Sequence, residues 1–261
     1  MLKICVNGAR RPDEHQALPV TSEDIAGDVA AARAAGVDAA HVHVKDLDGA
    51  DTLDASALAE VLTALQAAAP GFPVGVTTGA WAVSDPAERV ASIRSWGALR
   101  RRPDFASVNW HEEGADAAAA ALQSIGVGIE AGLWHADAVR AWSTSTHRDK
   151  CLRVLLELPD GVNASGVDFE ARRLLAMVRQ VSEDVPVLLH GEGSSTWPAL
   201  RLATRLGLST RIGLEDVLVL PDGSPAENNL ALVMAAKGVQ PSAAKGASGS
   251  GRVRRQGPAT L

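Results

Sequence analysis

The sequence contains only two cysteines, Cys5 and Cys151, and each lies inside an apolar run. Cysteines in such runs are usually small buried hydrophobic residues rather than reactive thiols. Because there are only two cysteines and they lie far apart in the sequence, a disulfide framework and a zinc site built from cysteines are both excluded. The sequence therefore offers no cysteine-based route to stability or to metal binding.

Long hydrophobic runs and an excess of positive charge are also absent. No stretch of about 18 apolar residues occurs, and the first residues, MLKICVNGARR, turn polar too early for a signal peptide. A net charge of −6 and a pI near 5.6 argue against nucleic acid as the main partner, because phosphate binding requires a basic surface. We therefore expect a cytoplasmic protein with neither a membrane nor a nucleic-acid partner.

Short apolar runs alternate with amphipathic stretches along the 261 residues. The strand-like runs are residues 3–8, 39–44, 73–79, 105–110, 128–134, 151–158, 185–191 and 210–216. The clearest helix-like stretches are residues 21–36, 167–181, 197–207 and 226–236. Eight strand–helix units spaced by roughly 25 to 35 residues predict a (β/α)8 TIM barrel over residues 1–236.

A doubly wound sheet is the alternative fold, but it normally carries a glycine-rich phosphate loop after its first strand. The segment that follows the first run here, NGARRPDE, is not such a loop. Residues 237–261 differ from the rest because they are basic and rich in glycine and serine. We predict a disordered tail there rather than a nucleic-acid-binding arm.

Polar residues gather where the strand-like runs end, which is the end of a TIM barrel that carries the active site. They are Asn7, Arg10, His41, His43, Thr77, Thr78, Ser107, Asn109, Glu130, His190, Glu192, Arg211, Glu215 and Asp216. Polar residues at one strand end are common, but polar residues at seven strand ends favour a functional site. Two acidic residues of the loop after the fourth run, Glu112 and Glu113, are instead predicted to be a solvated pair.

The segment HVHVKD places His41 and His43 two residues apart on a strand. Such residues point to the same face about 6.5 to 7 Å apart, so both imidazoles can bind one ion at Zn–N distances of about 2.0–2.1 Å. Two ordinary polar residues remain the simpler alternative. Glu215 is the best third ligand, because it leaves a coordination position open, as a catalytic zinc requires. His190 competes for that role, but we predict that it either belongs to the pocket wall or lies behind the metal ligands and supports them.

Several motifs resemble those of the β-keto acid cleavage enzymes. This family includes 3-keto-5-aminohexanoate cleavage enzyme and was long labelled a domain of unknown function. The motifs are NGARR, ALPVT, HVHVKDLDG, VTTGA, LLHGEGSSTW, RIGLED and LPDGSPAENNLALV. They occur in the family's order between about residues 3 and 236.

The resemblance implies a zinc-dependent TIM barrel, usually a homotetramer, that condenses a β-keto acid with acetyl-CoA. The products would be acetoacetate and a new acyl-CoA. The resemblance also implies that His41, His43 and Glu215 hold the metal. It further implies that Arg211 and Asp216 act in proton abstraction.

The resemblance implies substrate contacts as well, at Thr77, Ala80, Ser107, Asn109 and Glu130. Arg10 departs from the pattern. The family version that acts on an amino-bearing keto acid would carry an acidic residue at this position. We therefore expect Arg10 to contact the substrate and its distal group to be neutral or acidic.

Two other functions remain open. A zinc hydrolase of the amidohydrolase kind normally carries its His-x-His pair on the first strand and further histidines on the fifth and sixth, where this sequence has none. A non-catalytic metal-binding barrel would have no use for a positioned base beside the metal. The cluster of Arg211, Glu215 and Asp216 therefore speaks against it.

Overall fold

The computed structural model describes residues 1–239, and eight strands alternate with helices along this part of the chain. The strands are β1 (Leu2–Cys5), β2 (Ala39–Val42), β3 (Val74–Val76), β4 (Phe105–Asn109), β5 (Gly128–Leu133), β6 (Cys151–Leu158), β7 (Val187–Gly191) and β8 (Thr210–Ile212). Each lies within a predicted run or within one residue of it, and most end earlier than predicted. The residues beyond the strand ends belong to the loops that form the mouth of the barrel.

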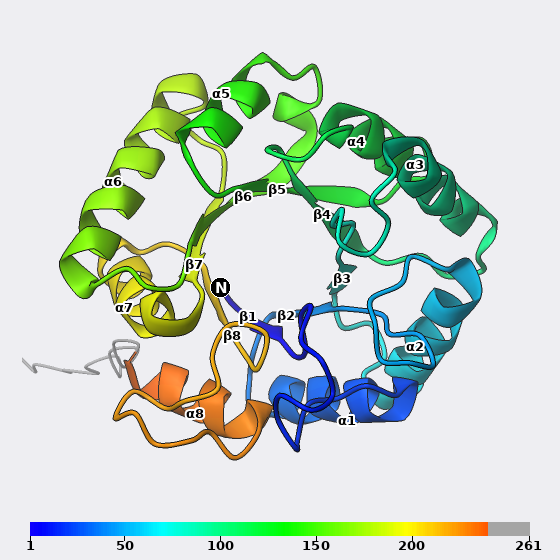
Figure 1. The fold of residues 1–261 in the computed structure, drawn as a ribbon, viewed down its shortest axis with the longest axis horizontal. Helices are drawn as coiled ribbons and strands as arrows, with labels where there is room; N and C mark the ends of the chain where they lie inside the picture. The colour runs from blue at the N-terminus through cyan, green and yellow to red at the C-terminus, as the bar shows by residue number, and fades with distance from the viewer. Residues whose placement is uncertain (240–261) are drawn as a thin grey trace, which may run out of the picture.

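The strands form one parallel sheet in the order β7-β6-β5-β4-β3-β2-β1-β8. A parallel bridge between Leu188 of β7 and Ser209 beside β8 brings the two ends of the sheet together. Figure 1 shows the resulting ring of strands inside a ring of helices. The predicted TIM barrel is confirmed, and the doubly wound sheet is excluded, because such a sheet stays open.

Eight α-helices surround the barrel within residues 1–239. They are α1 (Ser22–Ala34), α2 (Ala55–Ala68), α3 (Pro86–Ser95), α4 (Ala115–Ser124), α5 (Ala136–Thr144), α6 (Ala164–Val181), α7 (Thr196–Leu206) and α8 (Asn229–Val239). None of these helices is both long and apolar enough to cross a membrane.

Local signals explain where several helices begin and end. Thr21, Asp54 and Asp85 accept hydrogen bonds from backbone N–H groups in the first turns of α1, α2 and α3. Gly207 ends α7 at φ 67°, a conformation that costs glycine little. The predicted tail at 237–261 overlaps the last three residues of α8, and residues 240–261 lie outside the described part.

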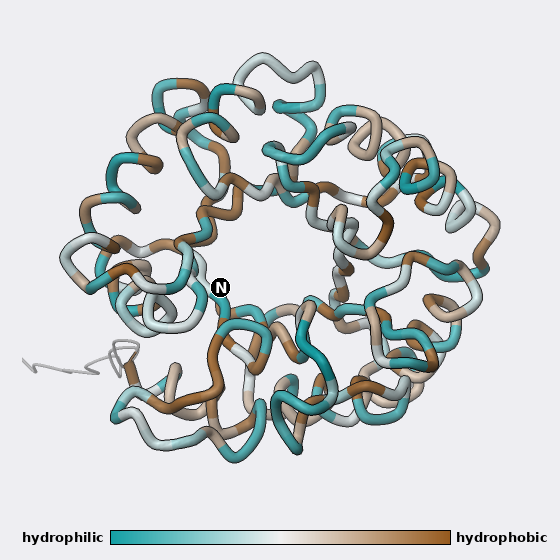
Figure 2. Tube along the Cα trace, viewed as in Figure 1, coloured by the Kyte–Doolittle hydropathy of each residue, from teal (hydrophilic) through white to brown (hydrophobic). Residues whose placement is uncertain are grey.

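The main hydrophobic core lies between the strands and the helices. Ile4, Val42, Val76 and Leu156 are among the strand residues buried in it. Figure 2 shows hydrophobic residues recurring along the strands and alternating with hydrophilic residues along the helices. Strand residues of the other parity point into the barrel, where most of the site residues lie.

Candidate active site

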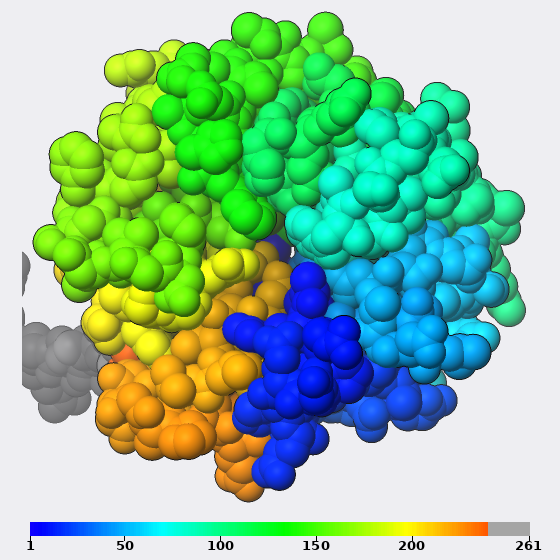
Figure 3. Space-filling view, in the orientation of Figure 1, coloured from blue at the N-terminus to red at the C-terminus, as the bar shows by residue number. Residues whose placement is uncertain are grey.

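A cavity of about 430 Å³ opens where the strands end. Figure 3 shows a hollow near the middle of this face, between segments that are far apart in the sequence. Nine of the predicted site residues line the cavity: Arg10, His41, His43, Thr77, Ser107, Asn109, Glu192, Arg211 and Glu215. Three others, Ala80, Glu130 and Asp216, do not line it.

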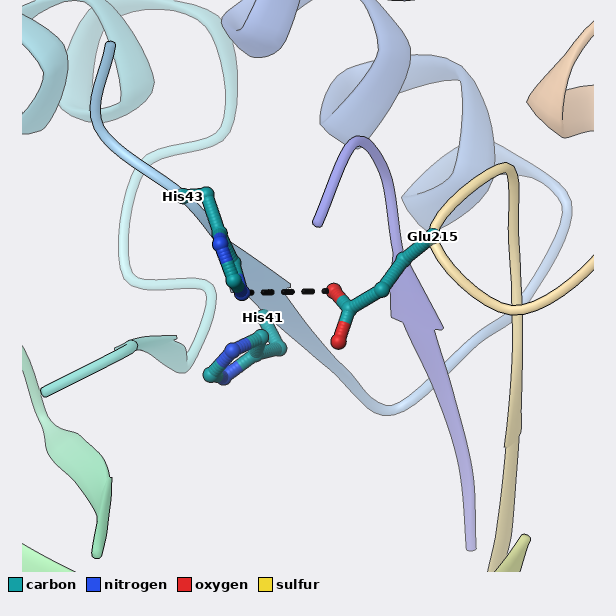
Figure 4. A group of neighbouring side chains, drawn as sticks. All are labelled: His41, His43 and Glu215. Carbon is teal, nitrogen blue, oxygen red and sulfur yellow. Dashed lines mark ion pairs between the residues drawn. The ribbon is translucent and has the colours of Figure 1, made fainter. Parts of the chain in front are cut away.

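His41, His43 and Glu215 form a cluster in which one ligand atom from each residue lies within 4.8 Å of the others. Figure 4 shows the imidazole of His41 on β2, the imidazole of His43 just beyond the end of that strand, and the carboxylate of Glu215, which reaches them from the loop after β8. His43 Nε2 lies 3.8 Å from Glu215 Oε2. Neither His41 Nδ1 nor Glu215 Oε2 has a hydrogen-bond partner among the described residues, although both atoms are buried. Two nitrogens and one oxygen with unused lone pairs fit a zinc ion.

Burial keeps His41 in the form that binds metals. Its side chain is almost fully buried, and this desolvation, with His43 and Lys3 as further causes, lowers its pKa well below the ordinary value. The ring is therefore neutral, and a neutral imidazole is the species that coordinates a cation.

His43 is oriented by a carboxylate that the sequence analysis did not identify. His43 Nδ1 lies 2.6 Å from Asp51 Oδ2 in the loop between β2 and α2. Burial alone would raise the pKa of Asp51, but bonds from His43 and Lys45 outweigh it and lower the pKa. An ionised carboxylate can only accept, so Nδ1 carries the hydrogen and Nε2 keeps its lone pair for a metal. The only sequence signal was an acidic residue soon after HVHVKD.

Asn7 and Gly8, in the turn after β1, contact the end of β2 and the side chain of Glu215. The Asn7 amide donates to the backbone oxygen of His43 at 2.9 Å and accepts from its N–H at 2.9 Å. Gly8 follows at φ +59°, where a Cβ atom would lie 2.4 Å from Glu215 Cγ. Asn7 therefore fixes the backbone at the end of β2, and Gly8 leaves room for the side chain of Glu215.

The chain turns sharply after β8. The N–H groups of Asp216 and Val217 both donate to the carbonyl of Gly213, at 2.9 and 3.1 Å. A Cβ atom on Gly213 would lie 1.9 Å from the carbonyl oxygen of Cys5, so only glycine fits there. The turn brings Glu215 and Asp216 to the same guanidinium, although neighbours on a regular strand face opposite ways.

Arg211 binds both carboxylates. Its Nη2 lies 2.7 Å from Asp216 Oδ1 and 3.0 Å from Glu215 Oε1. Asp216 is fully buried, and its Oδ2 has no hydrogen-bond partner within residues 1–239. Burial raises the pKa of Asp216 to about 7, against the opposing effect of Arg211. The arrangement holds one oxygen in place and leaves the other able to accept a proton.

His190 on β7 lies beside this pair. Its Nδ1 is 3.9 Å from Asp216 Oδ1, and its Nε2 is 3.3 Å from Glu157 Oε2. Burial, together with Arg211 and Lys3, lowers the pKa of His190, so the ring is neutral. His190 is not part of the three-residue cluster and does not line the cavity. Glu157, which does line it, was missed because it lies within an apolar run at the end of β6.

Thr77, just beyond β3, and Ser107 and Asn109 of β4 line the cavity as expected, whereas Thr78 does not. Asn109 is held by Glu112, a residue predicted to be solvated. Glu112 accepts from Asn109 Nδ2 at 2.8 Å, from the Ala80 N–H at 3.0 Å and from Arg89 Nη1 at 3.0 Å. Its side chain is only 10% exposed, so the predicted solvated pair is wrong for Glu112. Ala80 helps to fix this loop through its backbone.

Glu130 is correctly placed inside the barrel but not at the cavity. Its carboxylate lies 2.6 Å from Lys3 Nζ and 3.4 Å from Arg153 Nε, and all of its surface is buried. Lys3 belongs to β1, near the start of the barrel. The Glu130 carboxylate is therefore neutralised by cations inside the barrel, and Glu130 presents no surface for the expected substrate contact.

A cavity with these groups at the C-terminal end of the strands lies where TIM-barrel enzymes carry their active sites. The family model for beta-keto acid cleavage enzyme matches residues 1–246. The chain belongs to the beta-keto acid cleavage enzyme family, as its motifs predicted. Among curated proteins no sequence matches.

Solved structures share the fold at low sequence identity. The apo structure of ObcA is 17% identical with a TM-score of 0.64 and covers 80% of this chain and 57% of its own. A ternary complex of ObcA with C4-CoA adduct and oxalate is 17% identical with a TM-score of 0.63, covering 85% and 63%. Type I 3-dehydroquinate dehydratase from Clostridium difficile is 11% identical with a TM-score of 0.59, covering 90% and 92%. The chain thus spans less than two thirds of the ObcA chains.

Proposed function

We propose that this protein is a metal-dependent β-keto acid cleavage enzyme that uses acetyl-CoA. The observation that carries the proposal is the convergence of His41, His43 and Glu215 within 4.8 Å, beside a buried Asp216 that Arg211 holds by one oxygen. Membership of the family supports the reaction class. ObcA has been solved with oxaloacetate and with a C4-CoA adduct, which supports a keto acid and a CoA thioester as the two reactants here.

The donor set suits zinc, which binds histidine nitrogen and carboxylate oxygen and keeps an open position in catalytic sites. When bound, zinc would supply a Lewis acid for the keto oxygen of the substrate. Asp51 fixes the orientation of His43, and Asn7 fixes the backbone of the same strand end.

Side chains of the protein carry out the proton transfer and bind the substrate. Asp216 Oδ2 takes the proton from C2 of the keto acid, while Arg211 holds Oδ1. Because Asp216 is fully buried and does not line the cavity, this step requires its free oxygen to become exposed to the bound substrate. Thr77, Ser107 and Asn109 line the same cavity, and their hydroxyl and amide groups bind the substrate carboxylate. Thr77 Oγ1 accepts from the Gly79 N–H at 3.0 Å, so its own proton is available to the substrate.

The exchange of groups balances without a redox partner. The C2 carbanion takes the acetyl group as the acetyl–sulfur bond breaks, and CoA leaves as the thiolate. The thiolate then attacks the keto carbon, and the bond between C2 and C3 breaks. The proton held by Asp216 returns to C2, which gives acetoacetate and the CoA thioester of the remaining acyl fragment.

A hydrolase of the amidohydrolase kind draws no support from the site. Neither β5 nor β6 contains a histidine, so the further ligands of that class are missing from these strands. A metal-storage role leaves the buried Asp216 and its partner Arg211 without a purpose, because burying such a pair carries a desolvation cost.

The test combines metal analysis with product detection. We expect one zinc per chain and acetoacetate release when β-keto acids are screened with acetyl-CoA. His41→Ala and Glu215→Ala should lose both, whereas His147→Ala, which changes a histidine outside the cavity, should lose neither. Stoichiometric zinc in both cavity variants would contradict the assigned ligands. Failure of every keto acid with the zinc-loaded protein would contradict the reaction.

A further inference from the structure

In the proposed reaction two carbonyl oxygens gain negative charge, and the metal cluster serves only one of them. The keto oxygen of the substrate lies beside His41, His43 and Glu215. The thioester carbonyl of acetyl-CoA gains its charge when the C2 carbanion attacks it. This oxygen needs a hydrogen-bond donor of its own, because one such donor is worth about 10²–10³-fold in rate.

The lining of the cavity leaves one wall free for the thioester. In the proposed function the keto oxygen lies near β2 and β8 and the substrate carboxylate near β3 and β4. Ala9, Arg10 and Glu14, in the loop after β1, line the side next to the metal cluster, where we expect the distal group of the keto acid. The remaining wall comes from the ends of β5, β6 and β7, across the barrel from β1, β2 and β3 (Figure 1).

Few side chains of the cavity are free to donate to an oxygen at this wall. Both arginines bind carboxylates, and Trp81 Nε1 donates to Asp51. Two polar groups at the wall itself remain, the indole of Trp134 and the carboxyl of Glu157. Trp134 Nε1 is fully enclosed by protein, whereas the oxygens of Glu157 make no hydrogen bond within residues 1–239 and are not enclosed. Glu157 is therefore the group that a bound thioester can reach.

Glu157 can donate a hydrogen bond only if its carboxyl carries a proton, and its position favours this form. Leu133 pairs with Leu156 in the register of β5 and β6, so Trp134 and Glu157 follow at the same level. Glu157 is only 7% exposed and forms no ion pair with lysine or arginine in the described chain. The nearest ring nitrogen, His190 Nε2 at 3.3 Å, makes no hydrogen bond there. A carboxyl removed from water beside an apolar ring, with no cation paired to it, holds its proton.

The neighbouring charges favour the same form. Burial raises the pKa of Glu157 well above its ordinary value, and Arg211 opposes this rise. Three carboxylates add to the rise, in the order Glu192, Asp216 and Glu215. His190 supplies no positive charge, because burial lowers its pKa and keeps the ring neutral.

The other carboxyl groups at this wall are more open to water. Asp160 is exposed, and the N–H groups of Ser194 and Gly161 bind its carboxylate and lower its pKa. An ionised carboxylate can only accept hydrogen bonds, so Asp160 cannot donate to an oxyanion. Glu192 is half-buried. Glu157 is the most deeply buried of the three, and therefore the best donor.

We propose, resting on the proposed function for the two reactants, that Glu157 donates a hydrogen bond to the thioester carbonyl of acetyl-CoA and stabilises its oxyanion during acyl transfer. As the bond between C2 and the acetyl carbon forms, the π electrons of the carbonyl move onto its oxygen, beside the O–H group of Glu157. When these electrons return, the carbon–sulfur bond breaks and CoA leaves as the thiolate. Glu157 keeps its proton throughout, so it is ready for the next turnover.

Infrared spectroscopy detects this hydrogen bond without turnover. The zinc-loaded protein is mixed with acetyl-CoA labelled at its carbonyl carbon and with 2,2-dimethyl-3-oxobutanoate, a β-keto acid that has no hydrogen on C2 and cannot react. A hydrogen bond lowers the stretching frequency of a carbonyl group. The labelled band should therefore lie lower in the wild type than in Glu157→Met, which keeps the length of the side chain but cannot donate.

Two further variants calibrate the band. Glu157→Gln should keep part of the shift, because its amide can donate a hydrogen bond. Glu88→Met, the same change at an exposed position on α3, should keep all of it. The same band frequency in the wild type and in folded Glu157→Met would overturn the proposal.

Kinetics distinguish a donor from a residue that only supports the fold. Glu157→Met should lower the rate of acetoacetate release about 10²–10³-fold, while zinc content and exchange of the C2 hydrogens with deuterated water stay at the wild-type level. Glu157→Gln should lie within about tenfold of the wild type, the worth of one ordinary hydrogen bond. Loss of C2 exchange together with acyl transfer in Glu157→Met would show a structural role instead. Equal losses in the Gln and Met variants would show that Glu157 does not act as a donor.

The two measurements separate the two proposals. If the band shift depends on Glu157 but no β-keto acid releases acetoacetate, the proposed reaction fails and the contact of Glu157 with the thioester stands. If Glu157→Met releases acetoacetate at the wild-type rate, the reaction stands and the role of Glu157 fails.

Discussion

Replacing Asp51 with asparagine tests how the protein prepares its metal site. Asp51 Oδ2 accepts from His43 Nδ1 at 2.6 Å and from Trp81 Nε1 at 2.7 Å, and Oδ1 accepts from Lys45 Nζ at 2.6 Å. Asparagine replaces one of these oxygens with an NH2 group. That group must then face either the Lys45 ammonium or the donors of His43 and Trp81, so a donor meets a donor in either orientation.

The expected loss follows from the position of Asp51 behind a ligand. Carboxylates that orient metal-binding histidines are worth about 10- to 100-fold in metal affinity, or about 1.4–2.7 kcal/mol. We expect Asp51→Asn to weaken zinc binding by this factor, because His43 loses both its fixed tautomer and a negative charge beside it. The side chain of Asp51 is only 4% exposed, so water cannot easily replace the lost bond.

The assay is competition for zinc against a chromophoric chelator. The matched control is Asp54→Asn, three residues further along the same loop, where asparagine caps α2 as well as aspartate does. Trp81→Phe keeps a ring over His43, where the indole now stacks at 6.0 Å and 9°, but removes its bond to Asp51, and it should cost less than Asp51→Asn. If Asp51→Asn binds zinc within about twofold of the wild type, against the larger loss such partners usually cause, Asp51 does not organise the site.

Three further predictions concern the base, the first turn and the assembly. Asp216→Asn should keep zinc but lose about 10²–10⁴-fold in exchange of the C2 hydrogens with deuterated water, monitored by NMR; wild-type exchange with zinc bound would show that another group is the base. Gly8→Ala should destabilise the fold by about 1–2 kcal/mol and weaken zinc binding, because its φ is +59° and its Cβ would press on Glu215; denaturant unfolding and zinc titration check this, and an unchanged protein would show that the turn relaxes freely. Light scattering should give the mass of a homotetramer, consistent with Leu230 and Met234 exposed on α8, and removal of residues 240–261 should not change it; a monomer, or dissociation on truncation, would contradict this.

The barrel was predictable because it depends on patterns that sequence displays directly. Alternating apolar runs, helix caps such as Thr21 and a closing Gly207 are local signals, and each strand lies within its predicted run or within one residue of it. The cluster of His41, His43 and Glu215 was also within reach, since parity along β2 and a carboxylate after β8 are enough to propose it.

The partners of those residues were not predictable, because they are set by packing between distant loops. Glu112 looked like surface polarity until the structure placed it under Asn109 and Ala80. Glu130 and Lys3 are 127 residues apart and pair inside the barrel. In both cases the sequence shows that a charge exists but not which opposite charge or amide it meets.

The turn after β8 could not be predicted for the same reason, because it depends on packing between segments that are distant in the sequence. A regular strand would point Glu215 and Asp216 to opposite faces, yet both reach Nη2 of Arg211, at 3.0 and 2.7 Å. The turn requires a glycine at 213, pressed against the carbonyl of Cys5, and another at 8, beside the side chain of Glu215. One guanidinium therefore fixes both the proposed metal ligand and the proposed base, and any change that shifts Arg211 must disturb the two together. The spacing within RIGLED therefore places both carboxylates on one guanidinium rather than on one face of a strand.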